Sequence, residues 1–264
     1  MNYKIKKGRI KFDDENYEEA LKYFNEVSED DEDYMYVLIF KITCLMELER
    51  YDKALFLIES LLKEDPGDEL LLYEKIRCHI ALCENNEALV TLKIFEKIIS
   101  SDDKRMILCV SKFYKVLGDY DNALKFCNCA LEIDENFEEA IREKSLIGIG
   151  LNDYDIIDSS ADKLSEIIGN RGMGMISVFM LKLYVSKFDD CISIIENLEG
   201  DFKDNTLLLL KSIVYKELCE TLGVNLHVVG DVDIPVDEAI KLLKGYADNG
   251  VDKGIVCGVG FEII

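Results

Sequence analysis

The 264-residue sequence has no tryptophan, two prolines and two histidines. Proline interrupts helices, so its scarcity, together with 49% hydrophobic residues, suits an ordered and largely helical chain. No run of about 18 uncharged apolar residues occurs, so we expect no membrane-spanning helix. The segment 1–8 carries charge with no apolar core behind it, so we expect no secretory signal.

Positive charge is also scarce, because 31 Lys and Arg face 53 Asp and Glu and give a net charge of −22. Nucleic acids require clustered basic residues, so they are not expected as partners, and anionic membrane surfaces would repel the chain. The nine cysteines are an odd number, contain no Cys-x-x-Cys pair and do not resemble a secreted disulfide framework. We therefore expect free thiols and a cytoplasmic protein.

What the sequence does contain is one four-residue pattern that recurs at a fixed interval: an aromatic residue, two polar residues and a small residue. The pattern occupies Tyr17–Ala20, Tyr51–Ala54 and Tyr120–Ala123, and the same slot holds Asn85–Ala88, Tyr154–Ile157 and Phe188–Cys191. Its successive fourth residues lie 34 or 35 positions apart. A period of this size indicates a stack of repeated structural units rather than a single compact core.

Each repeat is predicted to form two helices around this slot, because the apolar residues recur with helical spacing. The first helices are expected over residues 2–13, 34–48, 68–82, 103–117, 137–150 and 172–185, and the second helices over 16–28, 51–64, 85–99, 120–133, 153–168 and 188–199. The small residue lets the two helices approach closely. Acidic residues are expected to cap the first helices, at Glu29–Asp33, Asp68, Asp102–Asp103, Asp134 and Asp204.

The stretch Lys115–Leu124 (KVLGDYDNAL) resembles the tetratricopeptide repeat, and Gly8, Phe24, Tyr114 and Pro66 occupy further positions of that family's pattern. The resemblance covers about residues 1–205 and implies an all-α fold, a right-handed α-α superhelical solenoid. Its six repeats would span 1–34, 35–68, 69–103, 104–137, 138–171 and 172–205. Ile157 and Cys191 replace the family's alanine, so repeats five and six are expected to pack more widely.

Residues 206–264 depart from the pattern and are predicted to form an irregular seventh helix pair that caps the stack. An insertion at 223–235 separates its helices. This insertion contains the strand-like run Leu226–Val229, which could close a hairpin with Val232–Ile234. The tail Gly254–Ile264 is also strand-like.

No residue pattern supports catalysis, a metal site or a cofactor, so the protein is not expected to be an enzyme. His79 and Cys83 share one helical face, but a closed metal site needs four ligands, and a satisfied core histidine is the commoner finding. The cysteines, Cys44 and Cys78 among them, are interpreted as buried structural thiols. The run Gly169–Gly174 precedes a predicted helix as a phosphate loop does. It follows a helix rather than a strand, however, so a helix C-cap is the preferred interpretation.

The resemblance also implies that the first helices line a concave face where partners bind. By the repeat spacing, one row would hold Ile5, Ile39, Tyr73, Leu108, Arg142, Ile176 and Leu210, and a second row Arg9, Thr43, Arg77, Lys112, Leu146, Met180 and Val214. From these rows we predict a partner-binding groove made of Arg9, Ile39, Tyr73, Arg77, Leu108, Lys112, Arg142, Ile176 and Met180. Arg9, Arg77 and Lys112 would either attract a partner or neutralise neighbouring acids, and the sequence leaves both interpretations open.

The resulting hypothesis is a non-catalytic adaptor or scaffold that binds a protein or peptide segment carrying acidic and apolar residues. A second hypothesis is a structural protein that associates with itself through strand pairing of the tail Ile255–Ile264. A regulatory arm joined to an enzyme fragment after Gly223 has no motif to support it. We expect a monomer or a weak homodimer that needs no nucleic acid, membrane or cofactor.

Overall fold

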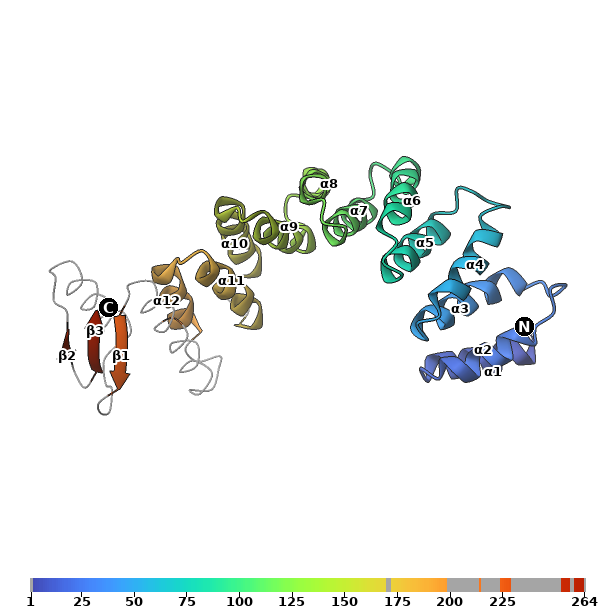
Figure 1. Cartoon of the computed structure of the whole chain (residues 1–264), viewed down its shortest axis with the longest axis horizontal. Coiled ribbons are helices and arrows are strands. Elements are labelled where there is room, and N and C mark those ends of the chain that lie inside the picture. The colour runs from blue at the N-terminus through green and yellow to red at the C-terminus, as the bar shows by residue number, and fades with distance from the viewer. Residues whose placement is uncertain are drawn as a thin grey trace. The chain divides into compact units, whose positions relative to one another are not determined.

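The computed structural model describes residues 2–169, 172–198, 214, 224–228, 253–256 and 259–263. The chain divides into two compact units, Met1–Ile133 and Asp134–Ile264, which we call unit 1 and unit 2. In the described residues of both units, helices follow one another as pairs in chain order (Figure 1). The predicted all-α architecture of stacked helix pairs is therefore confirmed.

Two sets of helices alternate along the chain. The first helices are α1 (Tyr3–Asp13), α3 (Tyr34–Glu47), α5 (Glu69–Ala81), α7 (Lys104–Val116), α9 (Glu138–Leu151) and α11 (Gly172–Tyr184). The second helices are α2 (Tyr17–Asn25), α4 (Tyr51–Leu61), α6 (Asn85–Ile98), α8 (Tyr120–Ile133), α10 (Tyr154–Ile168) and α12 (Phe188–Asn197). These bounds agree with the predicted helices to within a few residues, whereas the limits of the six repeats within 1–205 stay a prediction.

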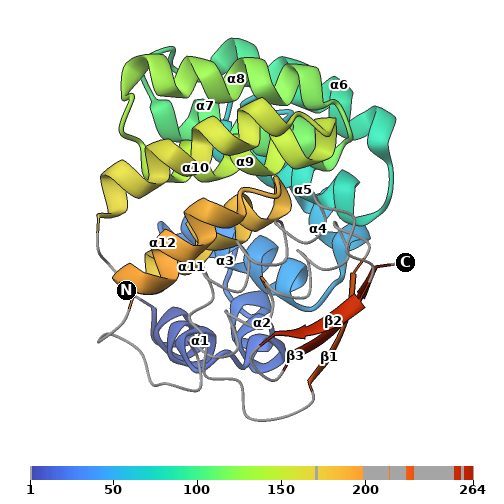
Figure 2. The same cartoon turned by 90° about the vertical axis from the view of Figure 1, so that its left-hand side faces the viewer.

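Each pair packs internally, and each second helix also packs on the first helix of the next pair within its unit. Figures 1 and 2 show α1 alongside α2 and α9 alongside α10. Helix α2 contacts α3 and α4 contacts α5 in unit 1, and α10 contacts α11 in unit 2. A first helix inside a unit therefore buries two sides, one against its own pair and one against the preceding pair.

The small-residue slot lies at the contact within each pair. Ala20, Ala54, Ala88 and Ala123 are all fully buried, and so are the larger Ile157 and Cys191. We expected Ile157 to push the two helices of the fifth pair apart. Gly148 of α9 lies opposite Ile157 and provides space for its side chain. A Cβ added to Gly148 would come 3.0 Å from Ile157 Cγ1. The missing side chain on α9 thus supplies the space that isoleucine needs on α10.

The helix starts confirm only part of the predicted acidic capping. Asp68 caps α5 by accepting a hydrogen bond from the Leu71 N–H at 2.9 Å, and Asp103 caps α7 by accepting from Arg105 and Met106. Asp33 precedes α3 without a side-chain cap bond, and the residue before α9 is Phe137. The predicted cap at Asp204 lies outside the described residues.

The turn within each pair uses one residue in the left-handed backbone region. These residues are Glu15, Glu49, Cys83, Gly118, Asn152 and Ser186, with φ between 54° and 81°. They recur once per pair, so the tight turn is a feature of the repeat itself. Five of them are not glycine and adopt this conformation against their steric preference.

Near the C-terminus three strands form a small antiparallel sheet: β1 (Val224–Val228), β2 (Lys253–Val256) and β3 (Val259–Ile263). Strand β3 lies between β1 and β2 (Figure 1), with Leu226 opposite Phe261. The strand-like character of the tail is confirmed. Strand β1 pairs with β3. The predicted hairpin with 232–234 lies outside the described residues, as does the first helix of the predicted seventh pair apart from Val214.

A candidate partner-binding surface on the first helices

The first helices of unit 1 lie side by side, because aromatic contacts join neighbouring members of the set. Phe12 of α1 meets Phe40 of α3 with ring centroids 5.0 Å apart, and Tyr73 of α5 meets Phe113 of α7 at 5.2 Å. Cys78 Sγ of α5 lies 3.1 Å from Met46 Sδ of α3. We call the exposed side of α1, α3, α5 and α7 the first-helix surface.

The predicted groove residues are not equally placed to meet a partner. Arg77 and Met180 are exposed, and Arg9, Ile39, Tyr73, Lys112, Arg142 and Ile176 are partly buried. Leu108 is only 1% exposed, so its inclusion in the groove was wrong. Its side chain is part of the buried core of unit 1, as is that of Ile5, which occupies the same slot of α1. The members in unit 1 that remain are Arg9, Ile39, Tyr73, Arg77 and Lys112.

Arg77 is held in a defined position by its own helix. Its guanidinium lies 5.8 Å from the centre of the Tyr73 ring, and Nη1 lies 2.9 Å from Glu74 Oε2. Burial raises the pKa of Glu74, and the nearby Arg77 opposes that rise. Arg77 therefore pairs with an acid of its own helix, and which of the two interpretations of the basic residues holds stays open.

Tyr73 is the centre of this part of the surface. Burial raises the pKa of its phenol, whereas the positive charges of Arg77 and Lys112 act in the opposite direction. Both cations therefore lie near the Tyr73 ring, on α5 and α7 respectively. In unit 2, Arg142 instead pairs with Glu138 of its own helix at 2.9 Å.

Sequence reasoning missed further exposed apolar residues on the first helices of unit 1. Tyr36 of α3 is 51% exposed, Leu70 of α5 is 47% exposed and Val116 of α7 is 60% exposed. Tyr36 and Leu70 occupy the same slot of consecutive repeats, so the repeat spacing could have identified them. Leu70 and Val116 are exposed on α5 and α7, which carry Arg77 and Lys112, and Tyr36 is exposed on the neighbouring α3.

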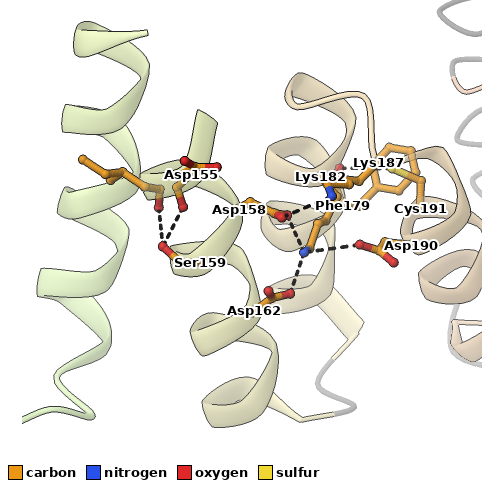
Figure 3. A network of polar contacts seen from close by, with 10 residues as sticks. Asp155, Asp158, Ser159, Asp162, Phe179, Lys182, Lys187, Asp190 and Cys191 are labelled. Atoms are coloured by element: carbon orange, nitrogen blue, oxygen red, sulfur yellow. Dashed lines mark hydrogen bonds and ion pairs between the residues drawn. The ribbon is translucent and has the colours of Figure 1, made fainter. Parts of the chain in front are cut away.

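A buried lysine in unit 2 was also missed. Lys182 of α11 is 4% exposed, and its Nζ lies 2.6 Å from Asp158 and 3.3 Å from Asp190. Figure 3 shows this nitrogen between Asp158, Asp162 and Asp190, which come from α10 and α12. Burial lowers the pKa of Lys182, but hydrogen bonds to Asp158 and Asp162 outweigh it and raise that pKa overall. We call this group the lysine clamp, and it joins the fifth and sixth helix pairs.

The residues considered for chemistry have structural roles. His79 is buried and its Nδ1 lies 2.7 Å from Glu84 Oε2, which confirms the interpretation as a satisfied core histidine. Burial raises the pKa of Cys44 to about 11 and that of Cys78 to about 12. Gly169 ends α10 with φ +57° and donates its N–H to Ser165, as expected of a helix C-cap.

In the part of the chain that the structure describes, no three His, Cys, Asp or Glu side chains gather in a way that could hold a metal ion. Within the same residues, no helix combines the length and apolar character needed to cross a bilayer.

Comparison with known sequences and structures supports one family. The family model described as "Tetratricopeptide repeat" matches residues 11–72 and 45–94. No curated protein matches the sequence. These matched residues cover α2 to α5 completely and most of α6.

Solved structures extend the likeness to the rest of the fold. A tetratricopeptide repeat protein from Parabacteroides merdae ATCC 43184 is similar with a TM-score of 0.59 and 15% identity, over 91% of this chain and 97% of that one. The C-terminal part of a repeat-containing protein from Cytophaga hutchinsonii gives 0.55 and 15%, over 83% and 80%. MamA from Desulfovibrio magneticus RS-1 gives 0.51 and 17%, over 64% and 95%. At these identities the likeness concerns the fold alone.

Proposed function

We propose that this chain, whose residues 11–94 match the tetratricopeptide-repeat family model, is a non-catalytic scaffold that binds a segment of another protein along the first-helix surface of unit 1. The observation that carries the proposal is the exposure of Tyr36, Leu70 and Val116 on three neighbouring first helices. Apolar side chains of this size favour contact with another protein over contact with water.

The partner segment is expected to combine apolar and acidic residues. Its apolar side chains would cover Tyr36 and Leu70, and a carboxylate would meet the cations beside Tyr73. Arg77 is already oriented by its contact with the Tyr73 ring and its ion pair with Glu74. Little side-chain entropy is therefore lost when its guanidinium donates to a second carboxylate, from the partner. In a chain of net charge −22, these cations also distinguish this region from the rest of the surface.

The corresponding residues of unit 2 belong to the same proposal. Ile176 is half-buried and Met180 is 51% exposed on α11, and Arg142 lies on α9. Their role would be to contact a partner segment along the first helices of unit 2. The proposal for unit 1 does not depend on them.

A test of this proposal must separate binding from stability. Alanine at Arg77 alone leaves the largely buried Glu74 unpaired and would destabilise the fold. We therefore choose the double change Glu74→Gln and Arg77→Gln, together with Tyr36→Gln. The matched control is Lys93→Gln with Val90→Gln, which are both exposed on the second helix α6.

The measurement begins with peptides selected from a random library on the unmodified chain. Fluorescence anisotropy then gives the affinity of the selected acidic-apolar peptides for each variant. We expect the first-helix variant to bind about tenfold more weakly or worse, with an unchanged melting temperature, and the α6 control to bind normally. Equal binding by both variants would contradict the proposal.

Self-association through the tail is the second candidate, and the arrangement of the sheet bears on it. Strand β3 already pairs with β1 on one side and β2 on the other, so its backbone has no unpaired edge for another chain. Association by strand addition would have to use β1 or β2. Removal of 251–264, followed by a measurement of mass in solution, tests it: an unchanged monomer excludes tail-driven assembly.

A further inference from the structure

Helix α1 has one side packed against its own pair and one side that carries exposed apolar residues. On the packed side, a Cβ added to Gly8 would come 2.5 Å from the Phe24 ring of α2. On the other side, Tyr3 is 69% exposed and Ile10 is 53% exposed. Lys7 lies between them, with its Nζ 5.8 Å from the centre of the Tyr3 ring. We call Tyr3, Lys7 and Ile10 the α1 stripe.

The same slots are buried in the first helices that follow. Val37 and Cys44 take the places of Tyr3 and Ile10 in α3, and both are fully buried. Leu71 and Cys78 take these places in α5, where they are also buried. The α1 stripe is therefore exposed at positions that the rest of the stack uses for packing.

Contacts elsewhere in the chain identify what normally covers these slots, which is the second helix of the preceding pair. At the Tyr3 slot of α11, a Cβ added to Gly174 would come 2.5 Å from Ile168 of α10. At the Lys7 slot of α5, Lys75 pairs with Glu59 of α4 at 2.9 Å. A helix that fits such a stripe therefore brings apolar side chains and a carboxylate at matching positions.

The positive charge of α1 limits which kind of partner can cover the α1 stripe. Between Tyr3 and Phe12 the helix has no acidic residue and five basic ones, Lys4, Lys6, Lys7, Arg9 and Lys11. Lys4 and Lys11 pair with Glu26 and Glu19 of the neighbouring segment, at 3.5 Å and 2.8 Å. A second α1 from another copy would bring five like charges to the same place. Repulsion therefore disfavours a symmetric α1–α1 dimer and favours an acidic partner.

We propose that the α1 stripe binds an acidic amphipathic helix of another protein, in the way that second helices cover the first helices of the following pairs. The partner's apolar ridge covers Tyr3 and Ile10, and one of its carboxylates pairs with Lys7. The α1 stripe shares no residue with those on which the proposed function rests, and this proposal does not depend on that function.

A peptide of this chain's own sequence provides the probe. Residues 153–168 contain α10, an acidic helix that presents Asp158, Asp162 and Ile168 to α11. Labelled with a fluorophore and titrated with the full-length chain, it should bind measurably. The double variant Tyr3→Gln/Ile10→Gln should weaken this binding at least about tenfold. The matched control Phe56→Gln, an exposed apolar position on α4, should leave it unchanged.

Charge reversal tests the carboxylate contact separately. Lys7→Glu should weaken binding of the same peptide, and a peptide with Asp158→Lys and Asp162→Lys should recover affinity for that variant but not for the unmodified chain. Circular dichroism verifies that each variant keeps its helical content, which is expected because all three positions are on the surface.

Three results would overturn the proposal. One is equal peptide affinity for the unmodified chain and the Tyr3→Gln/Ile10→Gln variant. Another is a dimer in sedimentation that this variant abolishes, because a second copy would then cover the stripe. The third is co-sedimentation with vesicles of anionic lipid that the same variant abolishes, because the stripe would then be a membrane contact.

Discussion

A single backbone conformation recurs at the turn of every helix pair, and it is adopted by different residues. Gly118 suits the left-handed region, because glycine has no Cβ to clash with the carbonyl. Glu49 adopts the same region with φ 55° and has no such freedom. The turn is therefore imposed by packing of the two helices and not by the residue at its centre.

Replacing Glu49 with glycine should therefore stabilise the protein. Relief of the backbone clash is worth about 1–2 kcal/mol, and the greater freedom of glycine in the unfolded chain offsets about half of it. We expect a net gain of about 0.5–1 kcal/mol, seen as a higher urea midpoint. The reverse change, Gly118→Ala, should lower the midpoint. A lower midpoint for Glu49→Gly would show that its side chain has a role that outweighs the strain.

Thiol reactivity should follow burial in the same residue-by-residue way. Burial raises the pKa of Cys191 to about 12, as it does for Cys78, and both side chains are covered. Cys83 is exposed at the turn of the third pair. Iodoacetamide at pH 8 should alkylate Cys83 before Cys78 and Cys191 and should reach these two buried thiols only in denaturant, as peptide mass spectrometry can measure. Early labelling of Cys78 would mean that α5 opens locally.

The exposure of a residue was harder to predict than its place in the repeat. The repeat spacing placed Leu108 and Tyr73 in one row, yet Leu108 is buried and Tyr73 is partly exposed. The slot fixes a residue's place along its helix, but the exposure of its side chain depends on how the neighbouring helices pack. Tyr36 was missed for a related reason, since an exposed aromatic residue looks like a core residue in the sequence alone.

At the scale of elements, the lysine clamp fixes α11 to the helices on either side of it. Its three carboxylates differ in exposure, and Asp162 and Asp190 are more than half exposed, so solvent screens their share. Asp158 is the best-covered partner. Burial raises the pKa of Asp158, but Lys182 and Lys187 outweigh that effect and lower it overall.

Lys182→Met should destabilise the protein by about 1–3 kcal/mol near neutral pH, because methionine keeps the packing of the stem and loses the ion pairs. The pKa of Asp158 is depressed in the fold, so its contribution exists above its unfolded pKa of about 4 and disappears as the pH falls through the folded value. The pKa of Lys182 is raised, so its contribution persists up to about pH 10 and is lost above that.

Urea denaturation of Lys182→Met and the unmodified chain across pH 2.5–9 checks this prediction (~1 kcal/mol resolution suffices). The difference between the two should be constant from about pH 5 to 9 and should shrink below about pH 4. Lys187→Met is the matched control, because its side chain is about half exposed and its pair with Asp158 is longer, at 3.6 Å. A difference that stayed constant into acid would mean that packing, and not charge, holds α11.

Elements were the most predictable level of the structure. Helix positions followed from the 34-residue period and from helical spacing, because both depend on burial that every repeat shares. The strand β1 was also recognised from its composition, but its partner was not. Composition identifies strands, whereas pairing joins Leu226 to Phe261 across a separation in sequence that no local signal spans.

For the whole molecule, stacking implies that a destabilising substitution in one helix pair mainly affects the adjacent pairs. Phe95 of α6 is fully buried in unit 1, and its replacement by alanine should cost about 3–5 kcal/mol. Hydrogen exchange should then show the greatest loss of protection in α5 to α7 and little change in α10 to α12. Uniform loss across all helices would indicate one cooperative fold and not a sum of coupled pairs.

The fit of Gly148 against Ile157 limits how such a chain could be recombined. In α7 the slot of Gly148 holds Tyr114, and the small residue on the paired helix α8 is Ala123. A chimaera that placed α7 before α10 would press tyrosine onto isoleucine, and one that placed α9 before α8 would leave a void between glycine and alanine. The unit that can be exchanged as a whole is therefore the helix pair. A recombination point should be tolerated between two helix pairs and not inside one.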